Sequence, residues 1–140
     1  MTGICVVACG QKKQPGEWPA LELYVGSYFR QCAAWALAKF DPGDIYVLSA
    51  KYGLIRGDEV LTPYNVRLGD RGAITWRQTK EHAEVLGLLD VDEVTVLGGV
   101  LYRGHCISVW GLERVKAPFG KISGIGYQMQ AMRNDRLGIS

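Results

Sequence analysis

The sequence has no apolar run that approaches the ~20 residues a membrane-spanning helix needs. It begins MTGICVVACGQKK, so its apolar run precedes its lysines, which is the reverse of a secretory signal. Cysteines are few, four in 140 residues, with no CxxC pair and no dense spacing. Because a chain of this length and ordinary apolar content needs no disulfides, we expect reduced thiols. These absences predict a cytoplasmic protein with no membrane partner.

The sequence also lacks a recognisable set of metal ligands. Cys5 and Cys9 share one face of the first predicted strand, but a zinc site needs three or four ligands at characteristic spacings. The other candidates, His82, His105 and Cys106, complete no such pattern. We therefore predict no metal and no cofactor.

A composition of 48% hydrophobic and 21% charged residues excludes disorder, collagen and coiled coil, and the length predicts a single domain over residues 1–140. One segment of the sequence contains acidic residues but no Lys or Arg. Residues 81–93 hold five of the 14 acidic residues and no Lys or Arg, which leaves 9 acidic against 16 basic residues elsewhere. This segregation is compatible with a basic face for phosphates, and equally with a solvated acidic helix end.

Apolar runs and helical periodicities alternate along the chain. Strands are predicted over residues 3–8, 44–50, 93–97 and 114–117, and helices over residues 27–40, 73–89, 100–110 and 127–136. The long segment 51–72 is predicted to be irregular, and a connection of that length is more often functional than idle. The alternation predicts an α/β fold: a single three-layer Rossmann-like domain with a short, mostly parallel sheet of four or five strands.

Ligands of such sheets bind beyond the carboxyl ends of the strands, where residues 9–14, 49–65 and 98–102 are expected. In the first segment, a glycine turn followed by Lys12 and Lys13 suits a phosphate, although neither GxxxxGK[ST] nor GxGxxG is present. The alternative is a pair of solvated lysines. Cys9 is either a nucleophile or, more simply, a packed thiol.

The second segment gathers hydroxyl, ammonium, carboxylate and phenol groups within seventeen residues. A tyrosine can stack on a base, a lysine can meet a phosphate, and a carboxylate can act as a base or stabilise a cation. The segment therefore suits a small ligand with a ring and a phosphate, and the alternative is a turn-rich loop that merely packs. In the third segment, Gly98 and Gly99 allow close approach by a ligand or by the neighbouring helix.

The blocks CGQKK, LYVGSYFR, LSAKYGL, DEVLTPYN, LGGVLY and PFGKISGIG occur in an order that resembles a small uncharacterised domain family of phages and bacteria. Members of that family are often labelled as similar to the peroxide-stress protein YaaA. The resemblance covers residues 4–132, and Ser-Ala-Lys-Tyr-Gly-Leu is its most specific part. It implies no settled activity. Asn65 stands where the family pattern has Asp, so an acid at that place is not required.

Two functions follow as hypotheses. The first is an enzyme that hydrolyses or exchanges the N-glycosidic bond of a nucleotide or nucleic-acid base, which needs a carboxylate and a held base but no metal. The second is a non-catalytic module that binds a nucleotide or nucleic acid through the same basic rim. The candidate catalytic residues are Asp58, Glu59 and Lys51, and the candidate ligand-binding residues are Cys9, Gln11, Lys12, Lys13, Ser49, Tyr52, Gly53, Tyr64, Gly98, Gly99 and Tyr102.

Lys51 follows a strand that should be central in the sheet, in a block rich in apolar residues. Its side chain either points into the cleft at the end of that strand or reaches out to solvent along its aliphatic stem. We expect the first arrangement, which makes Lys51 a phosphate ligand.

Overall fold

A computed structural model describes residues 3–139. Its main sheet has five strands in the order β4-β3-β1-β6-β7. The strands are β1 (Gly3–Ala8), β3 (Ile45–Ser49), β4 (Gly53–Arg56), β6 (Glu93–Leu97) and β7 (Val115–Lys116). β4 runs antiparallel to β3, and the other neighbours are parallel. This confirms the predicted α/β fold with a mostly parallel sheet.

β1 lies in the middle of the sheet because its apolar residues can be buried on both faces. Val7 is paired with Val47 of β3 on one side and with Leu97 of β6 on the other, and all three are buried. Such continuous runs of β-branched and aliphatic residues are typical of parallel strands covered by helices.

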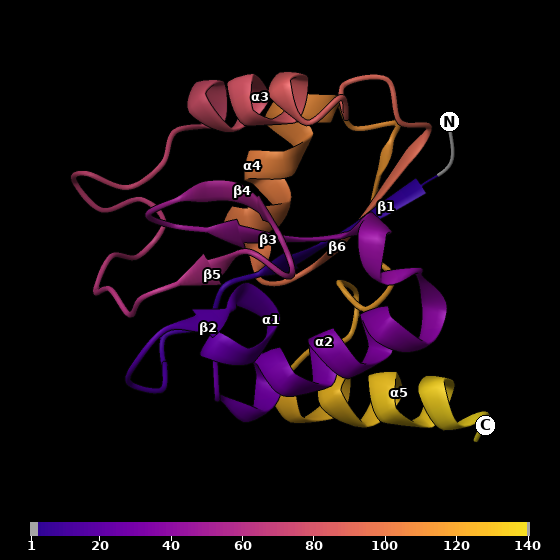
Figure 1. The fold of residues 1–140 in the computed structure, drawn as a ribbon. Coiled ribbons are helices and arrows are strands. Elements are labelled where there is room, and N and C mark those ends of the chain that lie inside the picture. Colours follow the sequence, from indigo (N-terminus) through magenta and orange to yellow (C-terminus); the bar gives the residue numbers. More distant parts are fainter. Residues whose placement is uncertain (1–2, 140) are drawn as a thin grey trace.

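Helices cover both faces of the sheet and complete three layers (Figure 1). The helices α2 (Ser27–Lys39) and α5 (Ile125–Leu137) pack on one face, and α3 (Trp76–Val85) and α4 (Val100–Trp110) pack on the other. The alternation along β1 divides the core: Cys5 and Val7 face α2, whereas Ile4 and Val6 face α4. Among residues 3–139, no helix is long and apolar enough to cross a bilayer.

The segment predicted as irregular, residues 51–72, holds two strands, which corrects that expectation. Gly53 has φ +81°, so the chain can reverse directly after β3 and return along it as the edge strand β4. The return buries Leu54 and Ile55. A second small sheet pairs β5 (Val60–Leu61) with β2 (Trp18–Pro19), and the one-turn helix α1 (Ala20–Leu23) follows β2.

The predicted element ends shift by a few residues. The helix expected over 73–89 is α3, which starts later because Thr75 and Gln78 form a capping box, and ends before Gly87 at φ +74°. The strand expected over 114–117 is only Val115–Lys116. The last helix begins two residues earlier than expected, at Ile125. A 3₁₀ turn (Pro42–Asp44) precedes β3.

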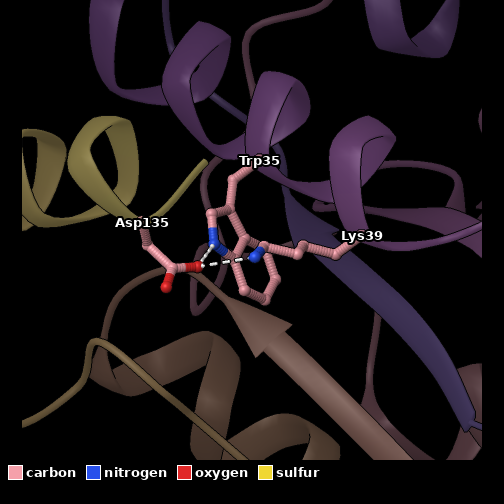
Figure 2. A network of polar contacts seen from close by, with 3 residues as sticks. All are labelled: Trp35, Lys39 and Asp135. Atoms are coloured by element: carbon pink, nitrogen blue, oxygen red, sulfur yellow. Dashed lines mark hydrogen bonds and ion pairs between the residues drawn. The ribbon is translucent and has the colours of Figure 1, made fainter. Parts of the chain in front are cut away.

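Asp135 ties the two helices of one face together (Figure 2). Its carboxylate accepts a hydrogen bond of 2.7 Å from the Trp35 indole and pairs with the Lys39 ammonium at 3.1 Å. The Trp35 hydrogen bond and then Lys39 hold the pKa of Asp135 below its usual value. Because the α5 carboxylate meets two α2 side chains, the contact joins the carboxyl-terminal halves of the two helices.

His105 makes the stability of the other face depend on pH. Its Nε2 lies 2.7 Å from the Thr79 hydroxyl, which is fully buried, and burial lowers the pKa of His105. The folded state therefore favours the neutral imidazole. The contribution of His105 to the free energy of unfolding is complete above its pKa in the unfolded chain, about 6.5, and is lost as the pH falls below that value. We expect the unfolding free energy to drop between about pH 7 and pH 5, and to drop less in His105→Gln. Urea unfolding at a series of pH values measures this, and equal slopes for both proteins would contradict it.

Candidate functional site

A cleft of about 750 Å³ opens at the carboxyl ends of β1 and β6. β3 lies on one side of β1 and β6 on the other, and the helices that follow β1 and β6 pack on opposite faces of the sheet. The connections therefore diverge at this point, and such divergence creates the crevice where open α/β sheets bind ligands. The loops after the two strands supply Cys9, Lys12, Lys13 and Gly99 to the cleft.

The charge of the cleft has one sign. Lys12, Lys13 and Arg67 line it, and none of the described residues that line it is Asp or Glu. No residue of the acidic segment 81–93 lines the cleft, and Glu93 begins β6, at the opposite end of that strand from the cleft. The cations that line the cleft attract anions.

Three helices begin at the cleft. Residues from the first turns of α2, α4 and α5 line it: Ser27, Leu101 and Ile125. The residues before these helices are Gly26, Gly99 and Gly124, and none provides a side-chain cap. First-turn N–H groups have no intrahelical acceptor, and the helix dipole favours negative charge there, so an anion in the cleft can satisfy several donors.

Part of the cleft lining is apolar. It is formed by aromatic and aliphatic side chains from α2, from the loop before α3, and from the first turns of α4 and α5. These are Tyr28, Phe29, Val66, Leu68, Leu101, Tyr102 and Ile125. A cleft lined by both cations and aromatic rings fits a ligand that carries both a ring and an anionic group.

Lys13 is held in place at the cleft. Its Nζ donates a hydrogen bond of 3.1 Å to the Gln11 carbonyl and lies 4.3 Å from the centre of the Tyr64 ring, within cation–π distance. Partial burial lowers the pKa of Lys13, and the nearby Cys9 partly opposes that shift. The Gln11 side chain accepts a hydrogen bond of 3.3 Å from Arg67, which connects the two cationic loops.

Cys9 is the cysteine that reaches the cleft. Its Sγ accepts a hydrogen bond of 3.4 Å from the Ala50 N–H and shares one of 3.2 Å with the Tyr102 hydroxyl. The other three cysteines are buried, and desolvation raises the pKa of Cys32 and of Cys106 to about 12. Burial also raises the pKa of Tyr102, so this phenol keeps its proton at neutral pH.

A chain of hydrogen-bonded hydroxyl groups holds the Tyr64 ring, which Lys13 contacts. Ser49 donates a hydrogen bond of 2.8 Å to the Tyr64 hydroxyl, and the Tyr64 and Tyr24 hydroxyls lie 2.5 Å apart. Ser49 Oγ also accepts the N–H groups of Lys51 and Tyr52, which closes the turn after β3. Burial raises the pKa values of Tyr24 and Tyr64, so both phenols stay neutral donors.

We expect Tyr64→Phe to lower the free energy of unfolding and to leave the cations of the cleft in place. The substitution leaves the fully buried Ser49 hydroxyl and the buried Tyr24 hydroxyl without their common partner, which costs about 1–3 kcal/mol. The Phe ring still lies below Lys13, so affinity for phosphate should change less than about threefold. Denaturant unfolding and phosphate titration of the same sample measure the two effects. Unchanged stability would contradict the role of the hydroxyl chain.

The structure brings together part of the predicted site. Two residues of the second segment, Ser49 and Tyr64, lie in the hydroxyl chain under Lys13 rather than on the cleft lining. The predicted residues that line the cleft are Cys9, Gln11, Lys12, Lys13, Gly99 and Tyr102.

Lys51 takes the arrangement in which its side chain reaches solvent. It is exposed, its Nζ lies 5.2 Å from the centre of the Tyr52 ring, and it is not among the residues that line the cleft. The reason is the turn after β3. Ser49 Oγ accepts the N–H groups of residues 51 and 52, and the chain reverses direction there, so Lys51 lies outside the cleft. The expected placement of Lys51 in the cleft is therefore corrected.

Asp58 and Glu59 are also separated from the lysines of the cleft. β4 runs back along β3, and the Gly57 N–H donates to the Ile45 carbonyl, so the chain reaches the amino end of β3 before these carboxylates. Asp58 borders a smaller hollow of about 440 Å³ beside Leu21. Glu59 borders another hollow with Tyr52. The expected convergence of Asp58, Glu59, Tyr52 and the cleft lysines is not found.

Two of the predicted ligand-binding residues, Gly53 and Gly98, do not line the cleft, and close packing explains why each is glycine. A Cβ on Gly53 would overlap the His82 ring, and its φ of +81° is unfavourable for other residues. A Cβ on Gly98 would overlap the Cβ of Ala8. Both positions therefore require glycine for close packing.

Sequence reasoning missed several lining residues. Gly26 and Ser27 carry a local signal, since a glycine and a serine at the start of a predicted helix mark a helix end that can bind anions. Arg67 carries no such signal, because it reaches the cleft only through the path of a long loop. In residues 3–139, no group of three or more His, Cys, Asp or Glu side chains could hold a metal ion.

Comparison with known proteins identifies the family of the chain. Residues 4–134 match the model of a family described as "Family of unknown function (DUF6884)". No curated protein and no solved structure matches the chain significantly. The match spans both halves of the sheet and every loop that lines the cleft.

Proposed function

We propose that this chain, which belongs to the DUF6884 family of unknown function, binds a nucleotide in its cleft through the phosphate group. One observation carries the proposal: Lys12, Lys13, Arg67 and three uncapped helix ends line a cleft that has no carboxylate among its described lining residues. Charge-assisted hydrogen bonds to phosphate oxygens are the strongest interactions that such groups can make.

The nucleobase would lie against the apolar residues of the cleft lining. Tyr28, Tyr102 and Leu101 provide rings and aliphatic surface in the same cleft. Stacking of a base on an aromatic side chain is worth about 1–3 kcal/mol and tolerates different bases. The volume of about 750 Å³ is within the usual range for sites of small molecules and cofactors.

The binding function has more support than hydrolysis of the N-glycosidic bond. That reaction needs a carboxylate beside the sugar, and Asp58 and Glu59 border other hollows. We therefore place the glycosidic hypothesis second. The four cysteines are free thiols, which fits the reducing cytoplasm that we propose as the location.

A ligand series measured by isothermal titration calorimetry tests the proposal. We expect AMP to bind at least tenfold more tightly than adenosine at low salt, a difference of about 1.4 kcal/mol. Inorganic phosphate should compete with AMP because it occupies the same donors. Raising the salt from low to physiological concentration should weaken AMP binding, as for any phosphate-led interface. Equal affinity for AMP and adenosine would contradict the proposal.

A further inference from the structure

We propose that the cleft is the active site of a thiol-dependent phosphomonoesterase in which Cys9 is the nucleophile. This inference rests on the proposed function, because it needs a phosphate held in the cleft. It adds the reaction class: transfer of a phosphoryl group from a phosphate monoester to sulfur, and then to water.

The Cys9 sulfur lies at the end of the central strand. Cys9 directly follows β1, at the carboxyl end of the central strand, and lines the cleft together with Lys12 and Lys13. Gly26 and Gly99, which precede two of the three helices that begin at the cleft, border the same space. A phosphate bound by these groups would have its phosphorus, the electrophilic atom, in the same cleft as the thiol. Nucleophilic catalysis requires this proximity.

Two hydrogen-bonding groups lie next to the Cys9 sulfur. The Ala50 N–H points at Sγ from 3.4 Å, and the Tyr102 hydroxyl lies 3.2 Å from it. Lys13 lines the same cleft as Cys9. Backbone and hydroxyl donors at the sulfur, together with a nearby ammonium group, are the features that proteins use to activate a cysteine.

Lys13 is the group that can move a proton. It lines the cleft, and it is held there by the Gln11 carbonyl and by the Tyr64 ring. Because partial burial lowers its pKa, Lys13 gives up a proton more readily than an exposed lysine. The described lining residues include no carboxylate that could serve instead.

The reaction balances with water as the only co-reactant. In the first step, the Cys9 thiolate forms a bond to phosphorus, the P–O bond to the leaving group breaks, and the leaving oxygen takes a proton from Lys13. In the second step, water loses a proton to the Lys13 amine and its oxygen bonds to phosphorus. The S–P bond then breaks, and its electron pair returns to sulfur. The products are an alcohol and inorganic phosphate, and the thiolate and the ammonium are restored.

Hydrolysis of p-nitrophenyl phosphate, together with mass spectrometry of the intact protein, tests the proposal. We expect the wild-type protein to release p-nitrophenol, and a quenched sample to carry one phosphoryl group on the peptide that contains Cys9. Cys9→Ala should lose both signals, with turnover reduced at least ~100-fold. The same variant should still bind inorganic phosphate in a titration, which shows that it is folded and that its cleft is intact.

A second variant and a control sharpen the test. Tyr102→Phe keeps the ring but removes the hydroxyl from Sγ, so turnover should fall by about tenfold while phosphate affinity stays the same. Lys80→Met removes a charge from α3, on the far side of the sheet from α2, and should change neither quantity. Turnover by Cys9→Ala at the wild-type rate would overturn the proposal. So would a wild-type protein that binds phosphate but neither hydrolyses the ester nor carries the phosphoryl group. If the wild-type protein does not bind phosphate, the proposed function itself fails.

Discussion

Gly98→Ala is expected to destabilise the fold by about 2–3 kcal/mol, although it adds a single methyl group. The new Cβ would overlap the Cβ of Ala8 at the end of β1 and would lie 3.5 Å from the Cβ of Tyr102. Neither neighbour is the flexible end of a side chain, so the backbone after β6 has to move. Urea unfolding followed by tryptophan fluorescence measures the loss.

Two matched variants separate this clash from the general effect of replacing glycine. Gly104→Ala lies inside α4, where an added Cβ meets nothing within 4 Å, and it should stabilise the protein by up to about 1 kcal/mol. Combining Gly98→Ala with Ala8→Gly moves the methyl group from one side of the contact to the other. The double variant should recover most of the stability. If Gly98→Ala and Gly104→Ala are equally stable, the close approach of β1 to the start of α4 is not as described.

The second large effect is expected on binding. Replacing Lys12 and Lys13 together by Glu should weaken AMP binding at least 100-fold, about 2.7 kcal/mol. The change removes two of the three cations that line the cleft and introduces carboxylates where the described lining has none. Lys12 is exposed and Lys13 is half-buried over the Tyr64 ring, so the fold should survive. Calorimetric titration of AMP measures the loss.

Lys80→Glu is the control for the sign of the charge. It lies on α3, on the face of the sheet that α2 does not cover, and it should weaken AMP binding less than twofold, an effect of about 0.4 kcal/mol from long-range charge alone. If the double variant and the control lose affinity equally, AMP binds by general charge attraction and not in the cleft.

The local patterns of the sequence predicted the layers of the fold well. The spacing of Phe29, Ala33 and Ala36 predicts the helix α2, and all three side chains are buried in the core. The apolar run from Gly3 to Ala8 predicts the central strand. Such patterns are reliable because burial of one helix face, or of both strand faces, acts on residues close in sequence.

The predicted positions of the site residues depended on the path of the chain after β3, and the structure shows a different path. Asp58 and Glu59 were expected near Lys12 because they follow a parallel strand. The turn at Gly53 instead forms an antiparallel edge strand, and this moves the carboxylates to the other end of the sheet. Arg67 reaches the cleft by the path of a loop without periodicity, which no local rule predicts.

Amide chemical shifts during an AMP titration test the central claim, that the cleft is the binding site, most directly. We expect the largest changes at Gly10, Gly26 and Gly99, which line the cleft, and small changes at Gly43 and Gly57, which line the hollow beside Asp58. Inorganic phosphate should move the first set of signals in the same way. Shifts confined to Gly43 and Gly57, or spread evenly over the protein, would contradict the account.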